Sequence, residues 1–400
     1  MNGVYFYDDL RARQFEPFAL TRPCSEMRAG TSLVRRRWES ATGLKSKGFI
    51  GAPHLAHFEE GDAPAAVDLN AYIPAGSVVV NSRCIISLDV RLEPFDLLMC
   101  DGLACAVRLA RAVPASKFAD GSLDLGTIQT SLGGRRVAGR WMSDVWDFIA
   151  TLGDQLAEDI PRRAKTLAMA APELTIYGKR EVFVEEGAEI GPNVVFDVSS
   201  GPILVRRGAI VSPFTHLVGP LYVGSESQIL GDRVASSSIG DVCKVRCELS
   251  NSVFVGHANK GHAGFVGHSY LGRWVNLGAL TTTSNLKNTY GPVQMWTRAG
   301  MRNTGQQFLG TLFGDHAKTG IGTMLSTGTV LGAGANVFGG TMPPKAVPPF
   351  AWGDSEPYDT FDLTRFLEVA ERAMERRHVK LGKKARQQLS DAHGSRWSVE

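Results

Sequence analysis

The stretch VRRGAIVSPFTHLVGPLYVGSESQI, residues 205–229, decides the fold of the later part of this 400-residue chain. An aliphatic residue recurs at every sixth position, at Val205, Val211, Leu217, Val223 and Ile229. Runs with the same step extend from about residue 180 to about residue 340: Val184, Ile190, Phe196; Ile239, Val245; Phe265, Leu271, Leu277; Phe313, Thr319, Leu325, Leu331, Val337. A period of six fits neither a lone helix nor a meander of ordinary strands, and it is typical of a β-helix. We therefore predict stacked coils, in which one inward-facing side chain per six residues builds a continuous apolar column.

The composition is that of a globular protein, with 44% hydrophobic and 21% charged residues. Four hundred residues favour two domains over one. The net charge of +3 does not favour a nucleic-acid partner. The basic run RRHVKLGKK, residues 376–384, is interpreted as a solvated helix end, with a phosphate or acidic-partner contact as the alternative.

Cysteine usage and the lack of long apolar runs bear on localisation. Six cysteines include no CxxC pair, so we expect free buried thiols in a reducing compartment. We find no apolar run of 18 residues and no secretory h-region at the N-terminus. The predicted location is the cytoplasm, without a membrane partner.

The sequence predicts four segments. Residues 1–140 have the pattern of an α/β domain, with strands near 3–9, 76–89 and 101–112 and a helix over 31–43 that ends at Gly43. A linker over 141–172 contains a predicted helix, 143–160. The β-helix is expected over 173–345, and a proline-rich exit with a helical tail over 346–400, including an amphipathic helix from 362 to 379 capped by Asp362.

The stretch VGHSYLGRWVNLGALTTTSN, residues 266–285, resembles a particular group of β-helix enzymes. Hexapeptide chains of this kind are similar to the left-handed β-helix acyltransferases, which form trimers with active sites between neighbouring prisms. The order Tyr-Leu-Gly, then Asn-Leu-Gly, then an Asn nine residues on, resembles the acetyltransferase half of the bifunctional enzymes that make UDP-N-acetylglucosamine. The resemblance implies a left-handed β-helix, a homotrimer and acetyl-CoA as cosubstrate.

The resemblance also implies a set of site residues. His268 is expected to be the base that takes the proton from the sugar amine, a task that suits an imidazole because its ordinary pKa is about 6.5. The histidine of the family stands three residues before the tyrosine, whereas His268 stands two before Tyr270, and His262 is the nearest substitute. Asn285 is expected to position the base or the amine.

Further residues are implied as contacts to the sugar phosphate. Tyr270 and Asn276 match family positions of this kind, and Arg233 takes the approximate place of a phosphate-binding arginine. Lys260 and Lys287 are the candidates for the charge of a family lysine whose place Ser250 takes. The segment 286–306 lacks the period of six and is expected to be a loop extending from the prism, which also serves as a possible contact between subunits.

A metal site is the alternative use of the histidines. His257, His262 and His268 supply the three imidazoles of some zinc sites, but spacings of five and six do not favour that use. The metal ligands of the chain are therefore left unknown.

The first domain has a resemblance of its own, in FEPFALTRPCSEMRAG, residues 15–30. It is similar to a divergent group of sugar-phosphate nucleotidyltransferases, which pair such a domain with a hexapeptide prism. Arg22 and Arg28 are the implied nucleotide-binding residues, and an Arg22–Glu26 pair that fixes the loop is the alternative. The Gly-rich loop G-x-G-T-R of ordinary nucleotidyltransferases is missing after the first strand. A nucleotidyl transfer usually needs Mg²⁺, for which Asp101 is a candidate, although Asp101-Gly102 is better explained as a turn.

The sequence thus predicts a transferase of nucleotide-sugar biosynthesis. Its substrates would be a sugar-1-phosphate, a UTP-like nucleoside triphosphate and acetyl-CoA, with Mg²⁺ for the first domain. Two alternatives stay open: a nucleotidyltransferase whose β-helix only trimerises, and a sugar-nucleotide-binding protein without catalysis.

Overall fold

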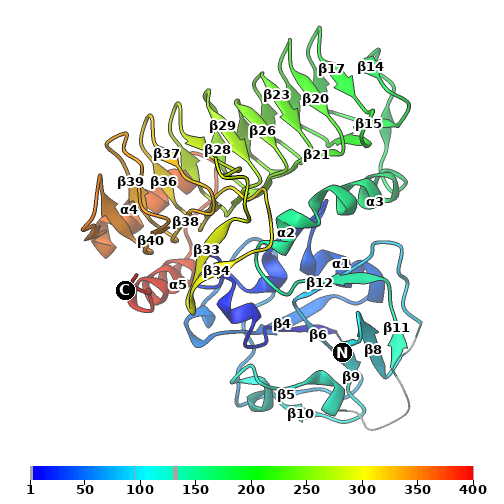
Figure 1. Cartoon of the computed structure of the whole chain (residues 1–400). Helices are drawn as coiled ribbons and strands as arrows, with labels where there is room; N and C mark the ends of the chain where they lie inside the picture. Colours follow the sequence, from blue (N-terminus) through cyan, green and yellow to red (C-terminus); the bar gives the residue numbers. More distant parts are fainter. Residues whose placement is uncertain (1–2, 94, 129–133, 400) are drawn as a thin grey trace. The chain divides into compact units, whose positions relative to one another are not determined.

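The structure is a computed structural model that describes residues 3–93, 95–128 and 134–399 (Figure 1). The chain forms two units. Unit 1 contains Met1–Asp147 and Gly382–Ser395, and unit 2 contains Phe148–Leu381 and Arg396–Glu400. A segment of the predicted C-terminal tail is thus part of the first unit.

Unit 1 is built on a six-stranded mixed sheet in the order β11-β8-β9-β6-β1-β4. Strand β1 is parallel to β4 and to β6, and β9 is antiparallel to β6 and β8. The strands are β1 (Val4–Tyr7), β4 (Ser46–Ile50), β6 (Val78–Asn81), β8 (Leu97–Cys100), β9 (Leu103–Arg108) and β11 (Arg135–Arg136). One face of the sheet packs on Phe118 and Leu125, which close a core around Tyr7, Val79 and Val107. The predicted α/β class of this region is confirmed.

Short elements complete unit 1. They are β2 (Arg28–Ala29), β3 (Ser32–Leu33), β5 (Tyr72–Ile73), β7 (Cys84–Ile86), β10 (Val113–Pro114) and β12 (Gly139–Trp141), with five 3₁₀ turns among the described residues. Helix α1 (Val34–Thr42) ends where the sequence predicts, because Gly43 takes a left-handed conformation with φ 67° and donates its amide to the Glu39 carbonyl. Asp101, with φ 50°, lies in the turn between β8 and β9, as its turn interpretation predicts.

Helix α5 (Lys383–Gly394) also belongs to unit 1. The Gln388 side-chain amide donates to the Thr21 carbonyl at 3.2 Å, and His57 Nδ1 lies 2.7 Å from Asp391 Oδ2. The second half of the run 376–384 therefore leads into a docked helix rather than into a solvated end.

Unit 2 is a left-handed parallel β-helix with three faces, as the period of six predicts (Figure 1). The first face contains β15 (Val182–Glu185), β18 (Ile203–Val205), β21 (Leu221–Val223), β24 (Ser238–Asp241), β27 (Val253–Gly256), β30 (Tyr270–Leu271), β35 (Leu312–Phe313), β38 (Val330–Leu331) and β40 (Ala346–Val347), with β13 (Met169–Ala170) antiparallel at its edge. The second face contains β16 (Glu189–Ile190), β19 (Ile210–Val211), β22 (Gln228–Ile229), β25 (Lys244–Val245), β28 (Asn259–Lys260), β31 (Asn276–Leu277), β36 (Lys318–Thr319), β39 (Asn336–Val337) and β41 (Ala351–Gly353), with β42 (Asp359–Thr360) antiparallel at its end. The third face contains β14 (Thr175–Tyr177), β17 (Val195–Asp197), β20 (His216–Val218), β23 (Arg233–Ala235), β26 (Glu248–Ser250) and β29 (Phe265–Gly267), followed by β32 (Thr282–Thr283) and β37 (Met324–Leu325).

The apolar column inside the prism is the predicted one, with one error. The core contains one row per face, for example Val205, Val223 and Ile239 from successive strands of the first face. On the third face, however, Val266 fills the row and Phe265 lies half-buried on the outside. The step from the third face to the first is six residues from Leu217 to Val223, but only five from Val266 to Leu271. A change in bend length shifts the alternation, and a shift of one residue turns every side chain to the other side.

The corners of the prism hold many residues with positive φ, among them His257 at 54°, His268 at 48° and Trp274 at 63°. Glycine usually takes such positions because it has no Cβ. At these corners, residues that carry a Cβ take the left-handed conformation. Each of the three stands between two strands of neighbouring faces.

Helices and a hairpin decorate the prism. The predicted linking helix is two helices, α2 (Asp147–Ala150) and α3 (Leu152–Ala164), the second of which contacts the first face. The expected loop extends from the prism as the hairpin β33 (Gln294–Thr297) and β34 (Gly300–Asn303). Helix α4 (Leu363–Glu375) begins at Asp362, whose Oδ1 accepts the Arg365 amide at 3.0 Å, as predicted. Within the described ranges, no helix is long and apolar enough to cross a membrane.

Candidate functional site

His268 and Asn285 form the central contact of the predicted site. His268 lies at the corner between β29 and β30, and Asn285 lies one coil further along, two residues after the end of β32. The Asn285 Nδ2 atom lies 2.9 Å from His268 Nδ1. The structure thus brings together the two residues that the sequence predicts as catalytic.

Two backbone hydrogen bonds and one ring contact hold His268 in place. Its backbone amide donates to the Ser250 carbonyl, its carbonyl accepts the Gly310 amide, and its ring stacks on Phe308 with centroids 5.4 Å apart. Burial lowers the pKa of His268 to about 4, because desolvation disfavours the charged imidazolium. The imidazole is therefore neutral near pH 7, the state that a general base requires.

Glycines leave the space that this pair occupies. A Cβ on Gly267 would stand 2.6 Å from Asn285 Nδ2, and a Cβ on Gly310 would stand 2.0 Å from the Gly267 carbonyl oxygen. A side chain at either position would displace the backbone or the amide. The glycines next to the two polar residues are thus part of the local geometry.

Tyr270 and Asn276 are not near each other on the prism. Tyr270 is fully buried on the first face, where its ring packs edge-to-face on Phe148 at 5.9 Å. Asn276 is exposed on the second face, where its Oδ1 accepts the Asn259 side-chain amide at 2.6 Å. Within one chain, only Asn276 of these two predicted ligands is accessible to a substrate.

Two of the predicted phosphate-binding cations, Arg233 and Lys287, lie in different parts of the prism. Arg233 is exposed on the third face, two strands before β29 along that face. The Lys287 ammonium donates to the Pro292 carbonyl at 3.0 Å, in the segment before the hairpin.

Lys260 does not fit the role that the sequence predicts for it. Its side chain is fully buried in the inward row of the second face, and its ammonium donates to the carbonyls of His262 and Ala263 at 2.5 and 2.7 Å. Burial lowers its pKa, an effect that the nearby Cys247 partly opposes. Lys260 therefore braces the bend before β29 from inside, where no phosphate can reach it.

The three histidines do not form a metal site. His257 stands at the corner between the first and second faces, where its ring lies 4.3 Å from that of Trp274, whereas His268 stands at the corner between the third and first faces. His262, the substitute base, is exposed. Among the described residues there is no group of three or more potential metal ligands.

Arg22 and Arg28 in unit 1 are buried and have internal partners. Arg22 donates to both carboxylate oxygens of Glu60, at 3.0 and 3.3 Å, and to the backbone carbonyl of Glu26. Arg28 donates to the Thr31 carbonyl at 3.1 Å. The predicted alternative, an Arg22–Glu26 pair that fixes the loop, is present through the Glu26 backbone carbonyl, while the Glu26 carboxylate pairs with Arg35.

Polar side chains gather at the carboxyl ends of the parallel strands β1 and β6, the edge where open α/β sheets bind ligands. Asp9 accepts from Asn81 Nδ2 at 2.8 Å and from Arg83 at 2.7 Å, and although burial raises its pKa, these bonds lower it overall. Burial raises the pKa of the neighbouring Asp8 to about 6, and its Oδ2 accepts the Cys24 amide. This cluster was not predicted from the sequence, although the pair of acidic residues directly after the first strand was a usable signal.

These carboxylates do not fit a resident Mg²⁺ ion. Both oxygens of Asp9 are taken by Arg83 and Asn81, and Asp8 is only 3% exposed. Mg²⁺ demands near-octahedral oxygen coordination, which two such groups do not offer.

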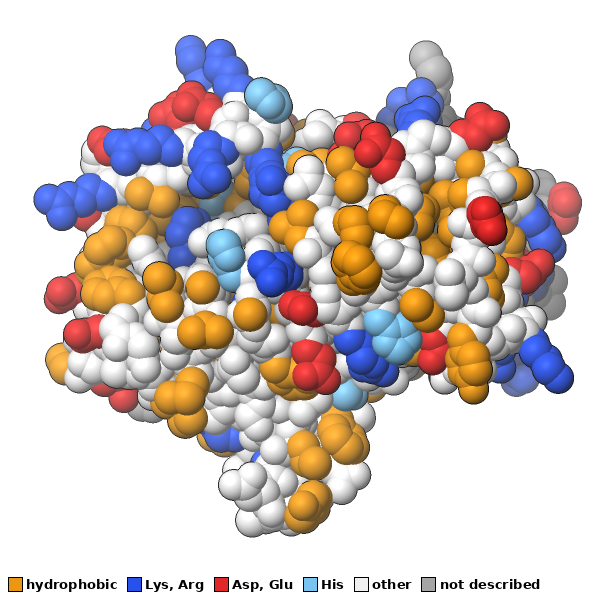
Figure 2. All heavy atoms as spheres, turned by 90° about the horizontal axis from the view of Figure 1, so that it is seen from above, with side chains coloured by type: hydrophobic (Ala, Val, Ile, Leu, Met, Phe, Trp, Pro, Cys, Tyr) orange, Lys and Arg blue, Asp and Glu red, His pale blue; other side chains and the backbone are white. Residues whose placement is uncertain are grey.

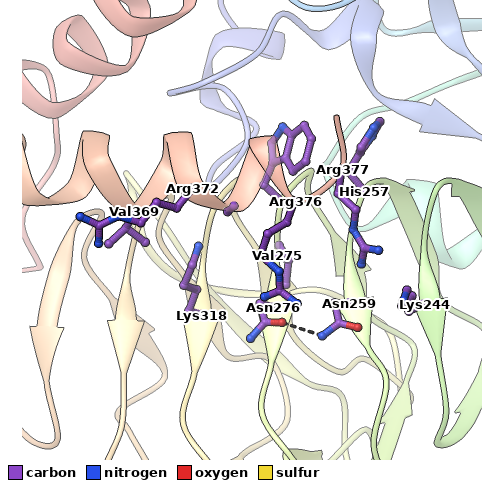
Figure 3. A pocket seen from close by; sticks show the side chains of 12 residues that line it. Lys244, His257, Asn259, Val275, Asn276, Lys318, Val369, Arg372, Arg376 and Arg377 are labelled. Atoms are coloured by element: carbon purple, nitrogen blue, oxygen red, sulfur yellow. Dashed lines mark hydrogen bonds between the residues drawn. The ribbon is translucent and has the colours of Figure 1, made fainter. Parts of the chain in front are cut away.

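A pocket of about 310 Å³ lies between the second face and α4 (Figure 3). Among the described residues, its lining contains five basic side chains, Lys244, Lys318, Arg372, Arg376 and Arg377, and no carboxylate. Trp274, Asn259 and Asn276 complete its walls. The basic run that contains Arg376 and Arg377 was predicted to be a solvated helix end, and the pocket itself was not predicted.

Comparisons with known proteins found one family model and several curated relatives. Residues 4–166 match the family model described as sugar nucleotidyl transferase. The "Bifunctional protein GlmU" of Bartonella quintana is 27% identical over 201 residues, which are 47% of this chain and 39% of that protein. The "Bifunctional sugar-1-phosphate nucleotidylyltransferase/acetyltransferase" of Sulfurisphaera tokodaii is 30% identical over 95 residues, 24% of each chain. The chain thus spans well under half the length of these relatives.

Among solved structures, a point mutant of AntD, an N-acyltransferase from Bacillus cereus in complex with dTDP and coenzyme A, matches with a TM-score of 0.19 and 11% identity. The match covers 52% of this chain and 99% of that one. Residues 4–166 are thus similar to sugar nucleotidyl transferases, and parts of the chain are similar to GlmU proteins.

Proposed function

We propose that the protein is an amino-sugar-1-phosphate N-acetyltransferase joined to a sugar-1-phosphate nucleotidyltransferase domain, acting in nucleotide-sugar synthesis of the UDP-N-acetylglucosamine type. The contact between His268 and Asn285 carries this proposal, because the two residues that the resemblance implies as catalytic lie 2.9 Å apart. Acetyl-CoA is the proposed acyl donor. The cytoplasm is the proposed location, which the six buried, free cysteines support.

In the proposed reaction, the amine nitrogen of the sugar attacks the thioester carbonyl carbon of acetyl-CoA. The carbon–sulfur bond breaks, the thiolate of coenzyme A leaves and is protonated, and His268 takes the proton that the amine loses. The low pKa of His268 keeps it neutral for this task down to about pH 5.

The tautomer of His268 decides which nitrogen acts. A base that works through Nε2 needs its proton on Nδ1, and Asn285 must then present its amide oxygen to that proton. Turning the Asn285 amide by about 180° exchanges its oxygen and nitrogen without moving other atoms, so the distance of 2.9 Å suits this arrangement equally. Asn285 is thus proposed to hold the catalytic tautomer.

A homotrimer is the proposed assembly. Large apolar side chains stand exposed along the corner between the second and third faces, with Phe214 77%, Leu280 58% and Ile321 72% exposed. Exposed apolar rows of this kind mark surfaces that bind another protein. A second copy packed along this corner would cover them.

The nucleotidyl transfer is assigned to unit 1, at the edge where β1 and β6 end. The substrates would be a sugar-1-phosphate and a UTP-like triphosphate, whose α-phosphorus the sugar phosphate attacks with release of pyrophosphate. Mg²⁺ would arrive with the triphosphate, since the carboxylates of this edge do not hold it by themselves.

The test uses a panel of sugar-1-phosphates with each nucleoside triphosphate and acetyl-CoA. Free thiol reports acyl transfer, and pyrophosphate reports nucleotidyl transfer, so the two halves are measured independently. We expect His268→Gln to lower thiol release by about a hundredfold or more and to leave pyrophosphate release unchanged. His262→Gln is the matched control, and a loss with His262→Gln but not with His268→Gln would reassign the base.

A second candidate, nucleotide-sugar binding without nucleotidyl transfer, is favoured by the state of Asp9. Its carboxylate is hydrogen-bonded to Arg83 and Asn81, and Arg22 is hydrogen-bonded to Glu60. Saturable binding of a UDP-sugar without pyrophosphate release from any pair in the panel would establish this candidate for unit 1.

A further inference from the structure

The pocket on the second face collects positive charge that the fold does not neutralise. Lys244 in β25 and Lys318 in β36 stand three strands apart on the second face, and Arg376 and Arg377 follow the end of α4. Figure 3 shows these side chains directed into one space, with the Asn259–Asn276 hydrogen bond at its floor. Figure 2 shows Lys and Arg side chains gathered toward the left of the face it draws, the side on which Figure 1 draws α4.

Few of these cations have partners. Arg372 donates to Glu368 at 2.9 Å, and Lys318 donates to the His316 carbonyl at 3.1 Å. In the part of the chain that the structure describes, the side chains of Lys244, Arg376 and Arg377 have neither an ion pair nor a hydrogen bond. Like charges placed together without partners are unfavourable, so the arrangement is explained best by an anion that binds there.

Burial and crowding support the same conclusion. Burial lowers the pKa of Lys318 to about 8, and burial together with Arg376 lowers the pKa of Arg377. An anion in the pocket would reverse both effects. The NH₂ group of Asn276 adds neutral donors, because only its oxygen is used by Asn259.

We propose that this pocket binds the diphosphate group of a nucleotide-type ligand, with Arg376, Arg377, Lys244 and Lys318 as its cationic contacts. A volume of about 310 Å³ is at the lower end of small-molecule pockets, roughly 300–1,000 Å³. It suits a compact group with several charges, and guanidinium groups bind phosphate oxygens in bidentate fashion. Coenzyme A and nucleotide sugars both carry such a diphosphate.

The pocket is distinct from the His268–Asn285 contact within one chain. Its prism residues come from the second face and from the corner shared with the first face, whereas His268 stands at the corner between the third and first faces. The proposal therefore requires no catalysis at His268. Binding at the pocket and acyl transfer at His268 can be lost separately.

The experiment measures binding of inorganic pyrophosphate, coenzyme A and UDP to the full chain by titration calorimetry at about pH 8. We expect one pyrophosphate per chain, with an affinity that falls by about tenfold or more in Arg376→Gln/Arg377→Gln. Binding should also take up protons at this pH, because the anion raises the pKa of Lys318.

Lys179→Gln/Arg180→Gln is the matched control, because it removes two adjacent exposed charges before β15, far along the chain from α4. Lys244→Gln removes a charge from the prism itself, so a fold change at the end of α4 cannot explain its effect. His268→Gln should bind pyrophosphate as the unchanged protein does, whether or not the proposed acyl transfer is correct.

The pattern of competition identifies the source of the diphosphate. Displacement of pyrophosphate by coenzyme A alone assigns the pocket to an acyl donor, and displacement by UDP alone assigns it to a nucleotide sugar. Equal affinity in the pocket variants and the control, or no saturable pyrophosphate binding, would overturn the proposal.

Discussion

Arginines in two regions of this chain differ in whether their charge is paired. Arg22 in unit 1 is 2% exposed and binds both oxygens of Glu60, so its charge is neutralised inside the fold. Arg376 and Arg377 after α4 face a pocket whose described lining contains no carboxylate. The first group lies in the motif that most resembles a nucleotidyltransferase, and the second lies in a run that looked like an ordinary helix end.

The comparison shows that a motif and a binding charge are separate properties. An arginine can be prescribed by a family pattern because it holds a loop together, and its buried charge is then unavailable to a ligand. A cation whose neighbours leave it unpaired is available, whatever pattern it belongs to. The predictions below test this distinction with changes that affect one class and not the other.

The largest effect is expected from Arg22→Met. Removing one partner of a buried pair leaves the other uncompensated, which we expect to lower the free energy of unfolding of unit 1 by about 3 kcal/mol. Urea denaturation followed by fluorescence measures it, with Arg180→Met as the exposed control. A change below about 1 kcal/mol would move Arg22 into the class of available charges.

Next comes the acid sensitivity that His268 confers. Its pKa is about 4 in the fold and about 6.5 in the unfolded chain, so the unfolded state binds more protons between these values. The contribution of His268 to the free energy of unfolding is therefore fully present above about pH 6.5 and is lost as the pH falls toward about 4. The urea midpoint should fall less between about pH 7 and about pH 4.5 in His268→Gln than in the unchanged protein or in His262→Gln.

A smaller effect is expected from Asn285→Asp. A carboxylate at this position always accepts from Nδ1–H, which fixes the catalytic tautomer, and its charge raises the pKa of His268. The acid limb of the rate of thiol release should move to higher pH by about one unit or more, with activity retained above it. Asn285→Leu, which offers no acceptor, should lose activity across the whole pH range.

The smallest effect is expected from Lys260→Met. The ammonium braces two carbonyls of an exposed bend, and an apolar chain of similar length fills the same inward position, so stability should change by less than about 1 kcal/mol. The KM for the sugar phosphate should stay the same. A rise in KM without a change in melting temperature would restore Lys260 as a phosphate ligand.

Much of the β-helix follows from the sequence because its repeat is local. One inward residue per six is enough to specify a coil, and Val211, Ile229 and Val245 occupy the row that the spacing predicts. The same row continues through Lys260, but its steps of 18, 16 and 15 residues from Val211 onward are too irregular for a count of six to place that lysine inside. The error at Phe265 arose where a bend changed length, which a fixed period cannot register.

The sites were less predictable because they depend on distant partners. Glu60 lies 38 residues from Arg22, and nothing in the local motif names it. The pocket depends on how α4 docks, which contacts such as Phe366 with His316 determine. His268 and Asn285 were predicted from the family resemblance, and they lie close together because their spacing of 17 residues is one coil.

The docking of α5 in unit 1 has a consequence for synthesis on the ribosome. Unit 1 needs Gly382–Ser395 to be complete, although most of it is made before residue 148. During translation the coils of the prism can form one after another while unit 1 still lacks α5. The part of the polypeptide that emerges first is thus the last to complete its fold. In nascent chains halted before residue 382, the surface of unit 1 that α5 contacts should be exposed to chaperones.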